Sequence, residues 1–221
     1  MESEKAKKRG RGRPSAKDQI DLNKILDIAT QHFANHGFQG TQLNAIAQEA
    51  GYSKYLMNYH FGNKEKLWKR SVEHLASKLA EKYLEAHSFL KDLDGLAALK
   101  AYTRQFVYFC AAYPEFHKIV FHEMCTKTER LTWLIENVLS FLYNQVHIEN
   151  IEVKDGVHYV FGYPLANLYA ILIGSTNTYF IHDIEMQKIF NVNPLAPKSI
   201  EQHADILIDI LFAKFEQTDE S

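Results

Sequence analysis

The chain has 221 residues, which is enough for one large domain or for a small and a medium one, and 46% of them are hydrophobic while 24% are charged. This composition is typical of an ordinary globular protein. The absence of an N-terminal charged-then-apolar leader with a small-residue cleavage site argues against export. The two cysteines, Cys110 and Cys125, form no CxxC pair, so we expect small core residues in a reducing cytoplasm.

Charge is distributed unevenly along the chain. The formal net charge is −2, yet residues 1–70 contain 13 Lys and Arg against 7 Asp and Glu, whereas residues 110–221 contain 7 against 15. A basic face concentrated in one segment is the electrostatic signature of nucleic-acid binding. An acidic remainder discourages the other part of the chain from lying on phosphates.

The first 17 residues form a basic arm, which we expect to be flexible. Seven Lys and Arg residues alternate with glycine and other small residues. The segment Arg11-Gly12-Arg13-Pro14 resembles the core of an AT-hook, so Arg11 and Arg13 are candidates to enter a narrow minor groove. A solubilising tail without structure explains the composition equally well, and both interpretations stay open.

Apolar residues at helical spacing predict a helix before residue 37. Its stripe consists of Leu22, Ile25, Leu26, Ala29 and Phe33. We expect this helix to end at Asn35-His36-Gly37.

Two short helices follow, with a glycine corner between them. Thr41 is a favourable N-cap for the first, whose inner face includes Ile46 and Ala50, and Gly51 follows at a position that favours a positive φ. Ser53 can cap the second helix, which extends to about Phe61. Helix, short turn with glycine, helix is the helix-turn-helix arrangement, although a helical hairpin within another all-α domain is the plainer alternative.

The outward face of the second short helix favours DNA. It presents Lys54, Tyr55, Asn58, Tyr59 and His60, with a single formal charge, whereas a merely solvated helix more often carries Glu and Lys four residues apart. Asparagine can pair with adenine, and lysine and tyrosine can reach guanine edges, phosphates or a thymine methyl group.

The flanking residues extend this motif into a longer pattern. Ile-Leu-x-x-Ala-x-x-x-Phe-x-x-x-Gly-Phe, Thr-x-x-x-Ile-Ala-x-x-Ala-Gly-x-Ser and Tyr-His-Phe-x-Asn-Lys-Glu-x-Leu occur in that order. The ordered set closely resembles the N-terminal domain of the TetR family of bacterial transcriptional regulators. The matching residues are Ile25, Leu26, Ala29, Phe33, Gly37, Phe38, Thr41, Ile46, Ala47, Ala50, Gly51, Ser53, Tyr59, His60, Phe61, Lys64, Glu65 and Leu67.

The resemblance implies which residues hold phosphates. In TetR-like proteins these lie at the start of the second helix and directly after the recognition helix. The corresponding residues here are Thr41, Gln42 and Lys64, with Tyr59 joining them. Such contacts fix the register of a protein on DNA and carry no sequence information directly.

The resemblance also implies which residues read bases. These are Lys54, Tyr55 and Asn58, with Ser53 and His60 at the margin. The family often has a small residue at position 55, tyrosine at 58 and proline at 62, where this chain has Tyr55, Asn58 and Gly62. The operator sequence therefore cannot be transferred from a relative.

The rest of the chain predicts a helical body. A long helix continues beyond Trp68, and further helices are expected from Asp94 to about Ala112, from Pro114 and from Thr128. Residues 147–163 alternate around Asp155-Gly156, which suits a β-hairpin, but inside a helical body we favour an extended inter-helix loop. The predicted fold is all-α: a basic arm at 1–17, a three-helix DNA-binding domain at 18–68, and a linking helix into an effector-binding and dimerisation domain at 69–217.

Residues 157–182 contain no Asp, Glu, Lys or Arg. A transmembrane span is the simplest explanation, but Pro164, Asn167, Gly174 and Asn177 interrupt it and no flanking basic cluster is present. A final helix is expected from Ser199, where Gln202 completes a capping box. The apolar surfaces of two such helices must be buried against other protein surface. The resemblance implies a homodimer through residues 164–182 and 199–215.

The body also contains more aromatic and polar side chains than a plain core requires. The candidates for an effector pocket are Tyr102, Phe106, Phe109, His117, Phe121, Trp133 and Asn137. Most aromatic stripes are core, so the resemblance, through the small-molecule effector that TetR-type bodies usually hold, supports only some subset of these. The effector's identity is left open.

Metal and catalytic sites are disfavoured. His117, His122, Glu123 and Cys125 are spaced around more than one helix face, and no nucleophile elbow, P-loop or dinucleotide-binding glycine turn occurs. We therefore predict a cytoplasmic, nucleoid-associated regulator, without cofactor or metal, that binds a palindromic DNA operator as a homodimer and is released by a small molecule. A TetR-like helical binding protein or enzyme without specific DNA binding is the alternative.

Overall fold

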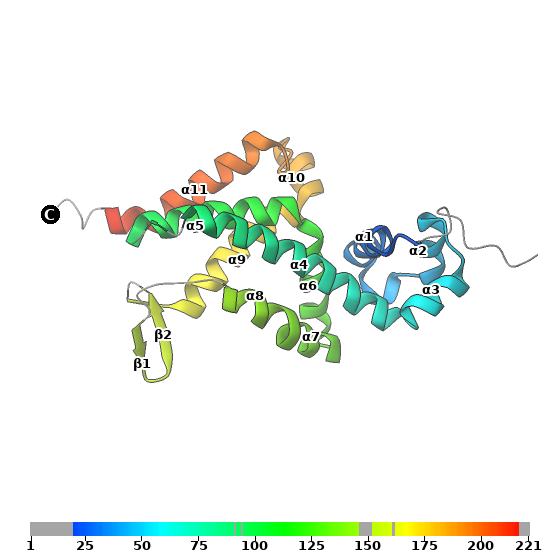
Figure 1. The fold of residues 1–221 in the computed structure, drawn as a ribbon. Coiled ribbons are helices and arrows are strands. Elements are labelled where there is room, and N and C mark those ends of the chain that lie inside the picture. The colour runs from blue at the N-terminus through cyan, green and yellow to red at the C-terminus, as the bar shows by residue number, and fades with distance from the viewer. Residues whose placement is uncertain (1–19, 91, 94, 146–151, 161, 217–221) are drawn as a thin grey trace, which may run out of the picture.

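The structure, a computed structural model, describes residues 20–90, 92–93, 95–145, 152–160 and 162–216. The basic arm with Arg11 and Arg13 lies outside these residues, as does Asp94, which we expected to cap a helix. Four helices come first along the chain: α1 (Leu22–Gly40), α2 (Leu43–Ala50), α3 (Lys54–Phe61) and α4 (Lys64–Leu90). We call α1–α3 the head; the long helix α4 extends from it into the other helices, which we call the body (Figure 1).

The α1–α2 junction is held by a buried threonine. Gly37 adopts φ 65° and ψ 177°, which kinks α1 and ends its regular part where the sequence indicated. The hydroxyl of Thr41 donates to the carbonyls of Gly37 (2.7 Å) and His32 (3.0 Å). The prediction of Thr41 as N-cap was wrong: Gln42 occupies that position and makes no side-chain capping bond.

The helix-turn-helix corner is built by local contacts that the sequence predicts. Gly51 ends α2 with φ 82°, and its N–H bonds to carbonyls in the last turn. The hydroxyl of Ser53 accepts from the N–H of Leu56 (3.2 Å), which confirms it as the N-cap of α3. Gly62 breaks the chain after α3 with φ 77°, and the side chain of Asn63 caps the start of α4.

One hydrophobic core joins the head to the first turns of α4. Ala29, Ile46 and Leu67 are fully buried in it, and Phe33 and Trp68 are 1% exposed. The same cluster extends to residues of the body, so the head packs directly on it.

The body begins with α5 (Gly95–Ala112) and α6 (Pro114–Thr126), where Pro114 takes the first turn as expected. Next comes one continuous helical segment with a π-helical turn inside it: α7 (Glu129–Leu134), η2 (Ile135–Leu139) and α8 (Ser140–Gln145). Thr128 occupies the N-cap position of α7, but its hydroxyl donates to the Glu123 carboxylate (2.7 Å) instead of receiving a backbone N–H.

A small sheet follows, which corrects our preference for an extended loop. Strands β1 (Glu152–Lys154) and β2 (Val157–Val160) pair antiparallel across Asp155-Gly156, and β3 (Tyr163–Pro164) pairs with β2. Asp155 and Gly156 have φ of 52° and 76°, the left-handed conformation that favours a tight hairpin turn. The alternation of the sequence was the correct signal, and the helical surroundings did not override it.

Three helices complete the chain: α9 (Leu165–Ile181), α10 (Asp183–Phe190) and α11 (Pro197–Glu216). The helix α10 was not anticipated. The expected start of the last helix at Ser199 was wrong, because α11 begins two residues earlier, so the capping box with Gln202 does not form at its first turn. In Figure 1, α5 and α11 run alongside each other while α9 crosses the body toward the hairpin.

Two further expectations concern exposure. Cys110 is buried as expected, whereas Cys125 is exposed near the end of α6 and is no core residue. Across the described residues, none of the helices combines the length and apolar content that crossing a membrane requires.

Candidate DNA-contacting face and effector cavity

The outer face of α3 is open to solvent. Lys54 and Asn58 are exposed, Tyr55 and Tyr59 are 78% and 74% exposed, and His60 is half-buried beneath Tyr59. Exposed tyrosines on a short helix are unusual for a monomeric surface, because large aromatic side chains are normally at least partly covered. The predicted base readers therefore share one accessible face.

The structure places the predicted phosphate-binding residues in two environments, some exposed to solvent and others engaged inside the protein. Gln42 is exposed at the start of α2, whereas Thr41 is only 2% exposed and uses its hydroxyl inside the head. The Lys64 ammonium donates to the carbonyls of Thr41 (3.1 Å) and Gln39 (3.4 Å), and it lies 4.5 Å from the centre of the Phe38 ring. Desolvation, and secondarily the nearby Arg130, lowers the pKa of Lys64. Thr41 and Lys64 thus fix the α1–α2 junction, and Gln42 and Ser53 are the accessible polar groups beside α3.

A buried ion pair lies where the head meets the body. Glu123, at the end of α6, is 2% exposed and accepts from Arg130 Nε at 3.1 Å. The Arg130 guanidinium stacks 3.9 Å above Phe38 in the head and 6.0 Å from Trp68 of α4. The pair therefore links α6 to α7 within the body, and the Arg130 guanidinium contacts the head through Phe38.

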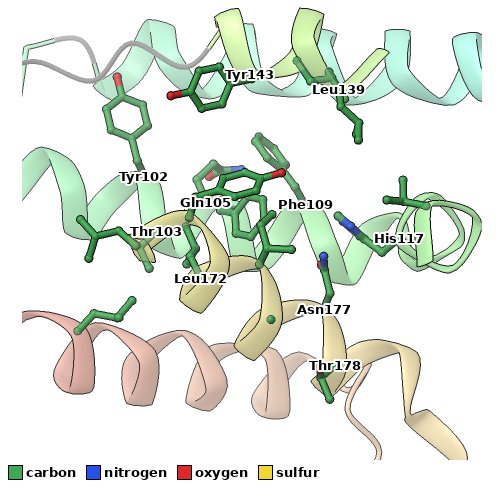
Figure 2. Close-up of a pocket in the computed structure, with 18 of the residues that line it drawn as sticks. Tyr102, Thr103, Gln105, Phe109, His117, Leu139, Tyr143, Leu172, Asn177 and Thr178 are labelled. Atoms are coloured by element: carbon green, nitrogen blue, oxygen red, sulfur yellow. The ribbon is translucent and has the colours of Figure 1, made fainter. Parts of the chain in front are cut away.

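The body encloses a cavity of about 500 Å³. Its walls come from α4, α5, α6, η2, α8, β2, α9 and α11. Figure 2 shows Tyr102 and Phe109 of α5, His117 of α6 and Leu172 of α9 around it. Aromatic and aliphatic side chains dominate the walls. This volume falls within the range of about 300–1,000 Å³ typical of small-molecule sites.

A few polar groups face the cavity. Asn177 Oδ1 is buried and has no hydrogen-bond partner among the described residues. Figure 2 shows Asn177 of α9 and His117 of α6 directed toward the same region of the cavity. Burial lowers the pKa of His117 to about 4, so its imidazole is neutral at physiological pH. Tyr102 is already engaged, because its hydroxyl lies 2.6 Å from His87 Nδ1.

Five of the seven predicted pocket residues line this cavity: Tyr102, Phe106, Phe109, His117 and Phe121. Trp133 and Asn137 do not, which corrects those predictions. Trp133 packs against Trp68 with ring centres 5.6 Å apart, and the exposed Asn137 donates to the Trp133 carbonyl. Asn177 also lines the cavity and was not among the predicted pocket residues, although it stood out as a polar residue in an uncharged helix. Within the described part of the chain, no three His, Cys, Asp or Glu side chains cluster as a metal site would require.

Comparison with known proteins identifies the head. Residues 25–70 match the model described as "Bacterial regulatory proteins, tetR family". The matched residues cover nearly all of α1, both helices of the helix-turn-helix and the start of α4. Residues 25–70 form a TetR-type DNA-binding domain.

Two TetR-family relatives extend the match into the body. The biofilm operon regulator IcaR of Staphylococcus epidermidis is 27% identical over 137 residues, which are 62% of this chain and 70% of IcaR. The regulator RutR of Escherichia coli is 34% identical over 100 residues, which are 45% of this chain and 46% of RutR. The chain thus spans less than half of RutR. These relatives are helix-turn-helix transcriptional regulators, and their similarity supports the function of this chain as a DNA-binding transcriptional regulator.

The fold agrees with that assignment. A crystal structure of a TetR-like transcriptional regulator from a Rhodococcus species superposes with a TM-score of 0.55, with 14% identity, over 87% of this chain and 94% of the other. The likeness extends beyond the head to the helical body, so the all-α prediction is confirmed. TetR-family regulators are non-enzymatic, which removes the enzyme from the alternatives.

Proposed function

We propose that this regulator is a repressor that binds an inverted-repeat operator as a homodimer and leaves it when a small molecule occupies the body cavity. The observation that carries the proposal is the double role of α6. One face of this helix lines the cavity through His117, Val120 and Phe121, while its other face contacts α1 of the head. A molecule in the cavity that displaces α6 would therefore also displace the head.

The contacts between α6 and α1 are specific. His122 Nε2 donates to the Ala34 carbonyl at 3.2 Å, and Gln31 Nε2 donates to Glu115 Oε1 at 2.8 Å. The His122 ring also lies over Gly37, the kink of α1, where an added Cβ would be 3.4 Å from it. A ligand shifts this arrangement only if it binds one position of α6 better than the other.

The exposed face of α3 supports separate roles for base-reading and phosphate-binding residues. Lys54, Tyr55 and Asn58 read base edges in the major groove, and Gln42 and Tyr59 contact phosphates. Ser53 and His60 lie beside these groups. The basic arm with Arg11 and Arg13 adds phosphate affinity that decreases steeply with salt.

Exposed apolar side chains on the last helices support the homodimer. Ile171 of α9 and Ile206 and Ile210 of α11 are 52%, 54% and 71% exposed. An apolar surface of this kind, on helices beside the cavity, is stabilised by a partner that covers it. A two-fold dimer places two copies of α3 in successive major grooves, with half-sites roughly 34–36 Å apart or a multiple of that distance.

The direction of regulation rests on the relatives. IcaR is named a negative regulator, and AcnR of Corynebacterium efficiens, 35% identical over 57 residues, is named a repressor. We carry repression over to this chain on that basis. As a regulator of transcription it acts where the chromosome lies, in the cytoplasm at the nucleoid.

The first test is selection of duplexes from a random pool by the purified protein at two salt concentrations. We expect an inverted repeat, with affinity that decreases as salt rises. Asn58→Ala should relax the preference at particular base pairs, each costing about 1–3 kcal/mol, because a bidentate base contact is lost. Asn137→Ala, on the exposed surface of η2, is the matched control and should select the same motif. Absence of any enriched motif would contradict the operator, and an identical motif for Asn58→Ala would contradict the assigned role.

Light scattering of the purified chain tests the dimer. The wild type should have twice the mass of one chain, and Ile210→Glu should shift it toward the monomer because a charge enters the apolar interface. Val153→Glu, on the exposed hairpin, should leave the mass unchanged. A monomeric wild type that still binds an inverted repeat would contradict dimerisation through α11.

A further inference from the structure

We infer that the cavity takes an uncharged, largely apolar molecule with a hydroxyl group, an alcohol or a phenol, and that Asn177 is the residue that recognises this hydroxyl. The inference deepens the proposed function and rests on it only for the link between binding and DNA release. Binding itself is a property of the body and is measured without DNA.

The walls of the cavity lack compensating charge. Among the described residues that line it, none is Asp, Glu, Lys or Arg. Moving an ionised carboxylate or ammonium group from water into such surroundings is costly unless an opposite charge receives it. An acid or an amine in its charged form is therefore a poor occupant.

The two histidines on the walls do not supply that charge. His117 is held neutral by burial, with a pKa of about 4. Its ring lies against Phe106 and Phe116, with centres 6.5 Å and 5.5 Å away. His182, at the end of α9, already lies with Nδ1 2.8 Å from Glu185 Oε2. An anionic ligand thus finds no unpaired cation among these groups.

Asn177 sets the requirement for a hydrogen-bond donor on the ligand. Its Oδ1 is buried and without a partner among the described residues, and a buried acceptor left unpaired is costly. A donor on the occupant of the cavity removes that cost. A hydroxyl group both donates and accepts, so it satisfies either end of the Asn177 amide, while the neutral imidazole of His117 offers one donor and one acceptor nearby. An ether or a hydrocarbon of the same shape cannot donate.

The aromatic walls fit the remainder of such a ligand. Phe106, Phe109, Phe116 and Phe212 contribute apolar ring surface, and Leu172 and Leu139 contribute aliphatic surface. Burial of apolar area then provides most of the affinity, and the single hydroxyl fixes the orientation.

The test is a matched set of probes titrated into the full-length protein by calorimetry: 1-decanol and 2-naphthol, the methyl ether of each, and decanoate, 2-naphthoate and decylammonium. We expect at least one hydroxyl compound to bind, its ether to bind about tenfold more weakly, and the charged compounds to bind on the order of 100-fold more weakly or not at all. In Asn177→Leu the hydroxyl compound and its ether should bind alike. Asn137→Leu, outside the cavity, should keep the wild-type ratio.

Several outcomes would overturn the inference. They are tight binding of a charged probe, an unchanged ratio of alcohol to ether in Asn177→Leu, and no binding of any probe by a protein that still binds operator DNA. Circular dichroism of both variants establishes that they are folded. If the hydroxyl probe binds as expected but leaves operator affinity unchanged, the ligand class stands and the proposed release mechanism fails.

Discussion

The head and the body of this regulator differ in how completely side chains fill their interiors. Where the head packs on the first turns of α4, Ile46 and Leu67 are completely buried and Phe33 and Trp68 nearly so, which leaves a closed core beneath an exposed recognition face. In the body, aromatic side chains of α5, α6 and α11 surround a cavity of about 500 Å³. A closed core holds the geometry of DNA contacts constant, whereas an open one leaves room for a ligand to change the shape of the body. The proposed function assigns DNA reading to the closed region and the response to a ligand to the region with the cavity.

The largest expected effect lies at the joint between the two regions. Arg130→Met leaves Glu123 buried without its cation, and we expect a loss of about 3–5 kcal/mol in the free energy of unfolding. Urea denaturation, followed both by far-UV circular dichroism and by tryptophan fluorescence, measures it. Coincident transitions indicate that head and body unfold as one unit, and separate transitions indicate that they do not.

Arg104→Met provides the control for that variant. The pair of Arg104 with Asp205 is shorter, at 2.6 Å, but largely solvated, so its loss should cost less than about 1 kcal/mol. Equal effects of the two variants would contradict the importance of burial at the joint.

The second prediction concerns the body alone and its response to acid. The folded-state pKa of His117 is about 4, below its ordinary value of 6.5, because burial disfavours the charged ring. Above pH 6.5 the group is neutral in both states and costs nothing. As the pH falls from 6.5 to 4, the unfolded chain binds a proton that the folded one does not, and up to about 3 kcal/mol of stability is lost.

The comparison of wild type with His117→Phe isolates the contribution of His117 to this loss of stability. The difference in stability between the two proteins, measured by urea denaturation at several pH values, should change across this window in favour of the variant. His158→Phe, on the exposed β2, serves as the control. A difference that is constant with pH would show that His117 is not held neutral by the fold.

The smallest effect belongs to the head. Gly37 has φ 65° and ψ 177°, a conformation that is essentially restricted to glycine, so Gly37→Ala should cost about 1–3 kcal/mol. Gly174→Ala is the matched control: Gly174 lies within α9, nothing lies within 4 Å of an added Cβ, and the change should stabilise by about 0.5–1 kcal/mol. Thermal unfolding of both variants measures the contrast. A neutral Gly37→Ala would mean that the kink tolerates a side chain.

The contrast between the regions also explains which features could be predicted. Gly51 and Ser53 act within a few residues of their own positions, so their roles follow from sequence. Thr41 looked like a local cap, but its hydroxyl is bonded to carbonyls of the preceding helix, a contact that only the folded head provides. In the body, the apolar periodicity located five cavity residues correctly, since a helix face can be assigned without knowing its neighbour.

Trp133 and Asn137 show the limit of that reasoning. Both have the residue type and spacing of wall residues, yet one packs on Trp68 and the other faces solvent. Helical spacing defines a face but not which of two neighbours the face meets. The orphaned acceptor of Asn177 was beyond prediction for a related reason: an unpaired group is defined by everything around it.

The π-helical turn at Ile135–Leu139 has a consequence for how one helix serves both regions. Before the turn, Trp133 packs on Trp68 at the start of α4, beside the head, and after it Leu139, Leu142 and Tyr143 line the cavity. A π turn contains one residue more than an α turn, and one residue corresponds to about 100° of rotation about the helix axis. The extra residue therefore rotates the part of the helix after the turn relative to the part before it, so that each part presents its side chains to its own contact surface. Deleting one residue from 135–139 would leave both halves helical but would turn Leu142 and Tyr143 away from the cavity.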